Sequence, residues 1–392
     1  MFAPTSKSGN YVRHQVLHGH SGPIFSLLTT EDGRFLASGG SDGMRIWNLD
    51  LGEPVKVPRW SAFLAASTAV VWVKRDDSAF EMVISGTQSG RLVCWERKQN
   101  GHFEENFVAN ACDLVEVTGM AYDGPSNRLA VCLRSGVAAA YIVRPNGLTK
   151  IFAVDFGDHV VLKAAAFGKM YGDQKDIMVA SLYSGDIFTL RGPHGEIVGE
   201  PWNIGTPIGD IAVDVHAGLI CMDDPSSGLN LYRIDDRKRI NSFPIEVTKK
   251  KRVRQIVFVE NNVIAGTSDH GIVYLWDGRS AKIHDELKVS KGNWIQAVAA
   301  CQQQGVGTII AANSSNSDEP NPISVWRKHT KRPLGLGVTL CGVLVFVRVF
   351  CWSGGGGCFV LFRYPPLVIL VLSMRFVQHL YHTGELASTV VG

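Results

Sequence analysis

The stretch His18–Asp50, HGHSGPIFSLLTTEDGRFLASGGSDGMRIWNLD, decides how the rest of the chain is interpreted. A Gly-His pair leads into an apolar run, and a turn separates that run from LASGG. The next turn, Ser-Asp-Gly, leads into an alternating stretch that ends in Trp-Asn. Short β-branched and aromatic runs bounded by Gly, Asp, Ser and Pro are typical of β-strands. We therefore expect four strands, at 23–29, 35–39, 44–48 and 54–59.

The same order of runs and turns recurs along the chain, and such repeats determine the whole fold. Two good copies are MVISGTQSGRLVCWE at Met82–Glu96 and VIAGTSDHGIVYLWD at Val263–Asp277. Weaker copies lie at Leu129–Val143, Met178–Gly192, Leu219–Asp235 and Thr308–Lys328. A large residue stands near the end of each copy, and we call it the anchor; the seven anchors are Trp47, Trp95, Tyr141, Leu190, Tyr232, Trp276 and Trp326. Their spacing of 42 to 50 residues is close to the ~40–45 of one propeller blade.

This pattern resembles the WD-repeat (WD40) family over roughly Tyr11–Lys328, strongly in the first and sixth units and weakly in the third to fifth. The resemblance implies an all-β fold, a seven-bladed β-propeller of four-stranded blades. Little strand-forming chain follows Trp326 before the composition changes. We therefore expect Tyr11–Leu17 to become the outer strand of the last blade and to close the ring, as is usual in this family.

Several polar residues could be mistaken for catalytic or metal-binding residues. The resemblance implies that His20, Ser38, Asp42 and Trp47 form a structural hydrogen-bonded tetrad rather than a catalytic set. The run Gly39–Gly43 matches G-x-S-x-G, but that motif needs a strand-to-helix turn, and here it joins two predicted strands. His14 and His18 lie about 13 Å apart on an extended chain, too far to share one ion. We expect no catalytic residue, metal or cofactor.

Composition limits the partners and the compartment. The 39 basic and 36 acidic residues give a net charge of +3, which does not favour nucleic-acid binding. Eight cysteines without a C-x-x-C pair argue against a disulfide scaffold or a zinc ribbon. The N-terminal residues 1–10, which we assign to an arm, lead into the repeats without an apolar signal sequence. We expect a monomer in the cytoplasm, with reduced cysteines.

A basic run marks one candidate docking surface. Lys249, Lys250, Lys251, Arg252 and Arg254 lie between the fifth and sixth units. In a WD propeller such a loop lies on the top face, together with the turns between the second and third strands of each blade. This run is either an ordinary solvated loop or a patch for an acidic partner.

The C-terminal part, residues 329–392, has a different composition. Residues 333–352, PLGLGVTLCGVLVFVRVFCW, contain one charge, Arg348, and at ~1.5 Å per residue they match one hydrocarbon thickness. The basic flank Arg327–Arg332 precedes them and predicts a cytosolic propeller, because basic flanks stay on the cytoplasmic side. Three interpretations stay open at this point: a membrane anchor, a tail without a selected fold, and a buried core segment.

The resemblance implies a non-catalytic scaffold or adaptor that binds other proteins through its top-face loops. If the tail is a membrane anchor, as its apolar run and basic flank indicate, it tethers this propeller to the cytosolic face of an intracellular membrane. One alternative is a membrane-anchored guanine-nucleotide exchange factor for a small GTPase, which has a similar plan. The Gly-rich potassium-binding loop of that factor is not found here. A second alternative is a propeller hydrolase, for which convergent acidic metal ligands are not found.

Overall fold

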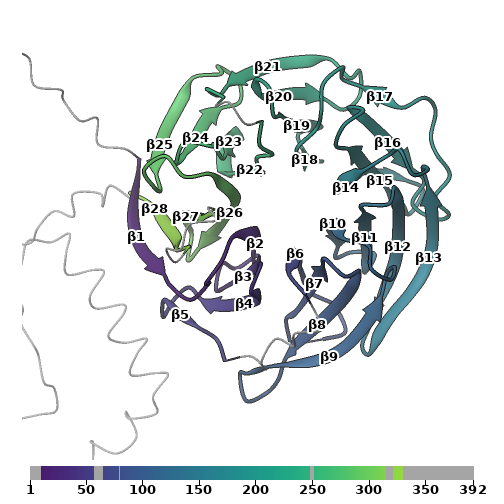
Figure 1. The fold of residues 1–392 in the computed structure, drawn as a ribbon, viewed down its shortest axis with the longest axis horizontal. Coiled ribbons are helices and arrows are strands. Elements are labelled where there is room, and N and C mark those ends of the chain that lie inside the picture. The colour runs from purple at the N-terminus through teal and green to yellow at the C-terminus, as the bar shows by residue number, and fades with distance from the viewer. Residues whose placement is uncertain (1–9, 57–64, 79, 248–250, 315–320, 330–392) are drawn as a thin grey trace, which may run out of the picture. The chain divides into compact units, whose positions relative to one another are not determined.

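The computed structural model of the 392-residue chain describes residues 10–56, 65–78, 80–247, 251–314 and 321–329. The chain divides into two units, 1–330 and 331–392, and the second lies outside the described residues. Almost all of the predicted N-terminal arm, residues 1–9, and the predicted membrane span 333–352 lie outside them as well. The first unit is a ring of seven four-stranded antiparallel sheets, shown in Figure 1. The predicted all-β, seven-bladed propeller is confirmed.

Each blade has strands a to d, ordered from the ring's axis outward. Blades 1 to 3 contain β2 (Ile24–Thr29), β3 (Phe35–Gly40), β4 (Gly43–Asn48), β5 (Glu53–Pro54); β6 (Ser67–Val73), β7 (Met82–Thr87), β8 (Arg91–Arg97), β9 (Phe103–Asn110); and β10 (Val117–Asp123), β11 (Arg128–Leu133), β12 (Val137–Arg144), β13 (Gly147–Asp155). Blades 4 and 5 contain β14 (Leu162–Tyr171), β15 (Gln174–Ser181), β16 (Asp186–Leu190), β17 (Trp202–Asn203); and β18 (Ile211–Asp214), β19 (Leu219–Asp224), β20 (Gly228–Arg233), β21 (Arg239–Pro244). Blades 6 and 7 contain β22 (Ile256–Phe258), β23 (Val263–Gly266), β24 (Ile272–Asp277), β25 (Ile283–Lys288); and β26 (Ile295–Gln303), β27 (Val306–Asn313), β28 (Ile323–Lys328), completed by β1 (Tyr11–Leu17). The 3₁₀ turn Glu260–Asn262 precedes β23.

The ring is closed by the N-terminal strand. β1 pairs antiparallel with β28, from Tyr11 opposite Lys328 to Leu17 opposite Ile323. It also contacts blade 6, because the Tyr11 N–H donates to Asp285 Oδ2 at 3.0 Å. Blade 7 therefore takes three strands from one end of the propeller and one from the other, a closure that covers the edge of β28.

Apolar packing between neighbouring blades forms the core. The buried residues fall into seven clusters, and each cluster joins two adjacent blades. The anchors all lie on strand c, and six of them are buried, namely Trp47, Trp95, Tyr141, Leu190, Tyr232 and Trp276. Trp326 is only partly buried, and the guanidinium of Arg13 on β1 lies 5.0 Å from its ring centre. A blade cannot bury both of its faces alone, so stacking around the ring supplies most of the stability.

Blade 1 differs from the expectation at its outer strand. The sequence predicts strand d at 54–59, but β5 ends at Pro54, and residues 57–59 lie outside the described residues. One further backbone bond, from Val55 N–H to Ile46 O at 2.8 Å, follows β5. The short strand reflects Pro54, which has no N–H to donate to the ladder.

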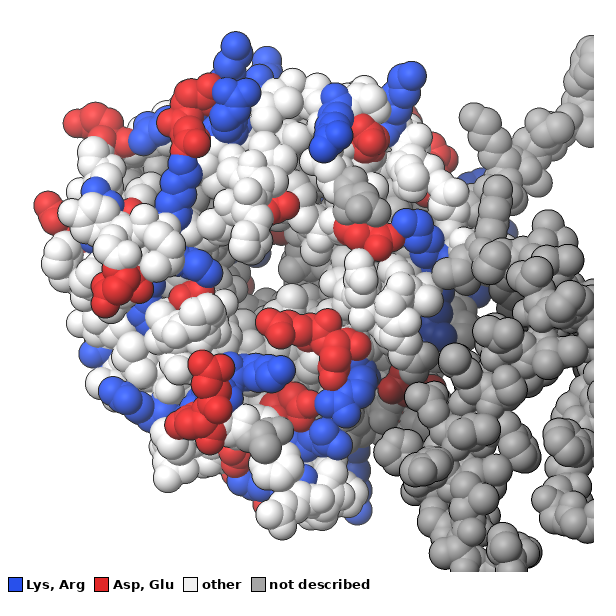
Figure 2. Space-filling model, turned by 180° about the vertical axis from the view of Figure 1, so that it is seen from behind, with Lys and Arg blue, Asp and Glu red and all other residues white. Residues whose placement is uncertain are grey.

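Two faces follow from the antiparallel order of the strands. The b–c turns and the d–a loops meet at one end of the ring, which we call the upper face, and the a–b and c–d turns meet at the other, the lower face. Figure 2 shows one face of the ring with basic and acidic side chains interspersed. Because neither sign of charge dominates this face, a charged partner would be selected by individual side chains rather than by the electrostatic field of a large patch.

Candidate functional site

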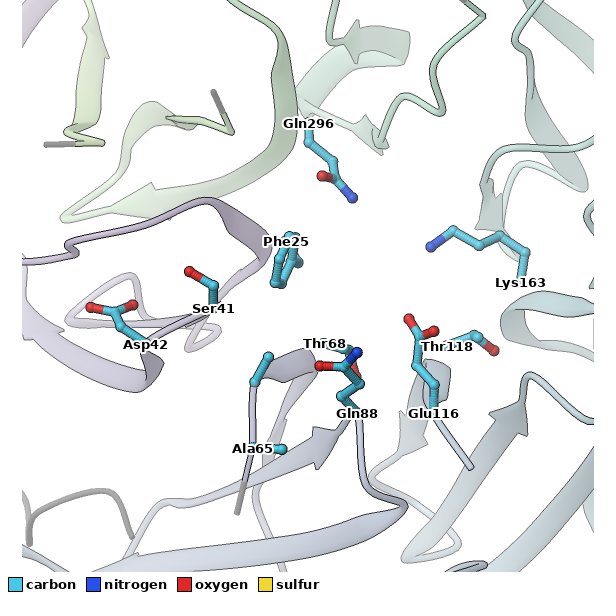
Figure 3. A pocket seen from close by; sticks show the side chains of 11 residues that line it. Phe25, Ser41, Asp42, Ala65, Thr68, Gln88, Glu116, Thr118, Lys163 and Gln296 are labelled. Carbon is cyan, nitrogen blue, oxygen red and sulfur yellow. The ribbon is translucent and has the colours of Figure 1, made fainter. Parts of the chain in front are cut away.

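A pocket opens at the upper end of the ring's central channel, and we call it the mouth (Figure 3). Its volume is about 480 Å³. The first residues of several inner strands and two b–c turns line it: Phe25, Ser41, Asp42, Ala65, Ala66, Thr68, Gln88, Glu116, Thr118, Lys163 and Gln296. Five of the seven blades, or the loops next to them, thus contribute to one open site.

Lys163 is the unneutralised charge in the mouth. It lies at the start of β14, and in Figure 3 its ammonium group points into the cavity. Among the described residues it makes no ion pair or hydrogen bond. The carboxylates that line the mouth already have partners, since Glu116 pairs with Arg134 at 3.1 Å and Asp42 pairs with Arg45 at 3.0 Å. The Gln296 Oε1 atom is buried and accepts no hydrogen bond. Within the part of the chain that the structure describes, Lys163 thus offers a ligand a cation without an ion-pair partner, and Gln296 offers a buried acceptor.

Asp210 lies deeper in the channel, in a second cavity of about 190 Å³ that continues from the mouth. Burial raises the pKa of Asp210 to about 6, although its carboxylate accepts the backbone N–H of Ile256 at 2.9 Å and feels the charge of Lys163. Asp210 is thus still mostly ionised at pH 7, and it takes up a proton as the pH falls through about 6.

The predicted tetrad forms one hydrogen-bonded chain in blade 1. The His20 ring lies between Asp42 Oδ1, 2.6 Å from Nδ1, and Ser38 Oγ, 2.7 Å from Nε2. Trp47 Nε1 donates to the same Ser38 oxygen at 2.8 Å. His20, Ser38 and Trp47 are almost fully buried, so the network ties strand c to the d–a loop and fixes one local geometry.

Asp42 connects this network to the mouth. Its burial alone would raise its pKa, but the hydrogen bond and charge of His20, the Ser21 N–H and Arg45 together hold the pKa of Asp42 well below its usual range. Asp42 is therefore ionised and fully engaged at neutral pH. This state suits a structural group and leaves it without a free lone pair for proton transfer to a ligand.

The described residues of the basic run between blades 5 and 6 do not share one exposed surface. Lys249 and Lys250 lie outside the described residues. Lys251 is exposed, and the Arg252 guanidinium lies 5.0 Å from the ring centre of Trp294. Arg254 is buried, with Nε 3.0 Å from Asp223 Oδ1 and Nη2 donating to Asp224 O at 2.8 Å. The prediction that Arg254 contacts a partner is wrong, because an internal ion pair between blades 5 and 6 removes it from the surface.

The motifs that resemble catalytic sites have ordinary structural places. Gly39–Gly43 spans the end of β3, the b–c turn and the start of β4, so no helix follows Ser41. His14 lies on β1, and His20 belongs to the tetrad. Within the described ranges, no three His, Cys, Asp or Glu side chains are close enough together to hold a metal ion. In the same residues, no helix has both the length and the apolarity to span a membrane.

Lys163 and Leu114 are the candidates that sequence reasoning missed. The one signal for Lys163 is a lysine inside the apolar run VVLKAAAF at 160–167. Leu114 lies in the d–a loop between blades 2 and 3 and is 89% exposed. Its sequence neighbours, ACDLVE, give no indication of that exposure, because the loop path determines it.

Comparisons with known proteins agree with this architecture. The WD domain, G-beta repeat, matches residues 11–48. Telomerase protein component 1 of Rattus norvegicus is 32% identical over 84 residues, which is 21% of this chain and only 3% of that protein's length. The crystal structure of Saccharomyces cerevisiae Sqt1 is similar in fold, with a TM-score of 0.61 and 9% identity over 80% of this chain and 98% of that one.

Neither the exchange-factor alternative nor the hydrolase alternative gains support from these matches. The repeat match covers β1 and the first three strands of blade 1, which hold the tetrad. The remaining blades repeat the same four-stranded plan around one axis. The match of one WD repeat, at residues 11–48, and the ring of seven four-stranded blades together support a WD40-repeat β-propeller.

Proposed function

We propose that the propeller is a non-catalytic platform for protein–protein interaction, and that its partners dock on the upper face. A WD40 propeller supports such a scaffold. The mouth supports docking on the upper face, because it is an open cavity of about 480 Å³ with polar groups that the chain itself leaves unpaired. Unpaired groups in a concave site are the usual means of orienting a bound ligand.

The test compares two pairs of bulky, uncharged substitutions. Ser41→Trp with Gln88→Trp changes two exposed residues of the mouth, and Leu51→Trp with Gln99→Trp changes two exposed c–d turns on the lower face. We expect the upper pair to reduce the recovery of partner proteins at least about tenfold, because it fills the contact with bulk whatever the partner's charge, and the lower pair to leave the recovery unchanged. Quantitative affinity capture from cells measures the recovery, and equal melting temperatures show that both pairs fold. A larger loss with the lower pair would contradict the proposal.

The proposal includes a monomer in the cytosol. Ring closure by β1 within one chain supports the monomer, since no second copy is needed to complete a blade. The described cysteines, Cys94, Cys112, Cys132, Cys221 and Cys301, are free thiols, which suits a reducing compartment.

We further propose that residues 333–352 tether the propeller to an intracellular membrane. Their support is the sequence alone, twenty residues with one charge after a basic flank. β28, the last described strand, ends at Lys328 on the lower face, opposite the proposed docking face. Within the flank, Arg327 donates to Gln303 Oε1 at 2.7 Å and Lys328 pairs with Glu260, so the cations left for lipid headgroups would be Lys331 and Arg332.

Stopping the chain after Arg332 tests the tether. We expect the full chain to sediment with membranes and to resist extraction by salt and by carbonate, and the shortened chain to stay in the supernatant. The physical reason is the apolar area of a 20-residue span, which exceeds what a peripheral charge contact supplies. Fractionation followed by immunoblotting measures the partition. Equal partition of the two chains would remove the tether and leave the platform proposal unaffected.

A further inference from the structure

The loop between β9 and β10, residues 110–116, presents a leucine in an unusual way. Leu114 has φ +58°, in the left-handed region that leucine rarely adopts, and 89% of it is exposed. A strained backbone persists only where the surroundings hold it, and such positions cluster at functional sites. A large apolar side chain displayed at a loop tip is also the kind of feature that a partner covers.

The surroundings of Leu114 are well defined. The loop packs on the b–c turn of blade 2, where Ala111 N–H donates to Gly90 O at 3.0 Å and Leu114 N–H donates to Ser89 O at 3.1 Å. Asn110 donates to Asp113 Oδ1 at 2.6 Å across the loop. A side chain at Gly90, which has φ +82°, would collide with the carbonyl of Cys112. The loop is therefore rigid, and the strain at Leu114 is maintained by its own hydrogen bonds.

This loop forms part of the wall of the mouth. Glu116, two residues after Leu114, lines the cavity, and so does Gln88, which precedes the turn that binds the Leu114 backbone. Lys163 reaches into the same cavity from blade 4 (Figure 3). The loop that displays Leu114 therefore also reaches, through Glu116, the cavity that Lys163 lines.

We propose that this surface, Leu114 with Lys163, binds a linear acidic segment of a partner protein, which places a carboxylate on Lys163 and covers Leu114 with an apolar side chain. The inference rests on the proposed function and names the chemistry of its partner. The residues that line the mouth favour a partner's carboxylate over its phosphate dianion as the group bound by Lys163. Glu116 and Asp42 line the same cavity as the lysine, Asp42 on its opposite side (Figure 3), and the arginines that pair with these carboxylates, Arg134 and Arg45, are already engaged. Phosphate sites use several free cations, usually arginines.

The test begins with an unbiased probe, a displayed library of random linear dodecapeptides selected on the full chain. We expect the enriched peptides to be rich in Asp and Glu and to carry an apolar residue nearby. Synthetic copies are then measured by fluorescence anisotropy. Lys163→Glu should weaken their binding at least about tenfold, because it replaces attraction by repulsion in a partly enclosed site.

Leu114→Asn separates binding from folding. Asn tolerates the left-handed region better than Leu, so this variant should melt at the same or a higher temperature while binding weakens several-fold. Matched controls are Leu51→Asn, a leucine 70% exposed on the lower face, and Lys238→Glu, an exposed lysine on the lower face. Both controls should bind like the original chain.

Each result decides between the proposals. Peptides that are basic, peptides that bind only when phosphorylated, or acidic peptides indifferent to Lys163→Glu would overturn the acidic-segment inference. If such peptides still lose binding in the Ser41→Trp, Gln88→Trp variant, the platform proposal is supported without the acidic-segment inference. Failure to select any peptide would count against the acidic segment, while captured protein partners sensitive to the upper-face pair would still support the platform.

Discussion

Deletion of residues 1–17 is expected to prevent the ring from closing and to leave a chain that aggregates or melts without a cooperative transition. β1 is the fourth strand of blade 7, and it buries Tyr11 and Leu17 against the neighbouring blades. Arg13 adds bonds to the Lys288 and Val289 carbonyls of blade 6, at 2.8 and 3.1 Å. Losing two buried side chains and a strand ladder costs at least about 5 kcal/mol, which is comparable with the whole stability of a domain.

The measurement is size-exclusion chromatography followed by a thermal scan of each chain. Deletion of residues 1–9 is the matched control, because it removes N-terminal sequence and leaves β1 intact. The control should elute and melt as the full chain does. A Δ1–17 chain that elutes as a monomer and melts within a few degrees of the control would show that β1 does not close the ring.

The repeats made the fold predictable because each one carries its own local signals. Trp47, Trp95 and Trp276 stand at the end of alternating runs, so strand c of those blades could be located from the sequence. Leu190 and Tyr232 replace Trp in the weak blades, and spacing rather than residue type located them. The tetrad positions followed the family resemblance, because the network lies within a single blade and within 28 residues of chain.

The candidate site could not be predicted in the same way. Lys163 matters because it meets the loops of other blades in the mouth, and that meeting depends on ring closure rather than on any local pattern. Leu114 matters through a backbone angle that the turn of blade 2 imposes. Arg254 shows the converse error, since a run of basic residues indicated a surface patch although its partner, Asp223, lies 31 positions earlier in the sequence. Contacts between blades carry the information that single repeats lack.

Among single substitutions, we expect the replacement of Arg254 to lower the free energy of unfolding most. Its backbone N–H donates to Asp223 Oδ2 at 2.8 Å, its Nε lies 3.0 Å from Asp223 Oδ1, and both side chains are almost fully buried. Burial raises the pKa of Asp223, and the charge of Arg254 is the strongest influence that lowers it. Arg254→Ala removes the counter-ion of a buried carboxyl group, so we expect the free energy of unfolding to fall by about 3–5 kcal/mol at a pH above 8, where Asp223 is ionised in the original chain.

The pH dependence distinguishes this mechanism from a simple loss of packing. An acid whose pKa is raised in the folded state stabilises the fold at low pH, and that contribution is lost as the pH rises through the folded pKa. Burial raises the pKa of Asp223 to about 8 in the original chain, and without Arg254 this pKa rises further. At pH 5 and pH 7 both folded chains therefore hold Asp223 protonated, and the deficit of Arg254→Ala should stay at about 1–2 kcal/mol; it should grow only above pH 8, where Asp223 ionises in the original chain alone. Urea unfolding of both chains at pH 5, 7 and 9.5 measures the deficit, with Arg252→Ala as the control in the same loop, expected to cost about 1 kcal/mol or less at every pH. A deficit that stays constant from pH 5 to pH 9.5 would mean that Arg254 acts through packing alone, and that Asp223 does not depend on its charge.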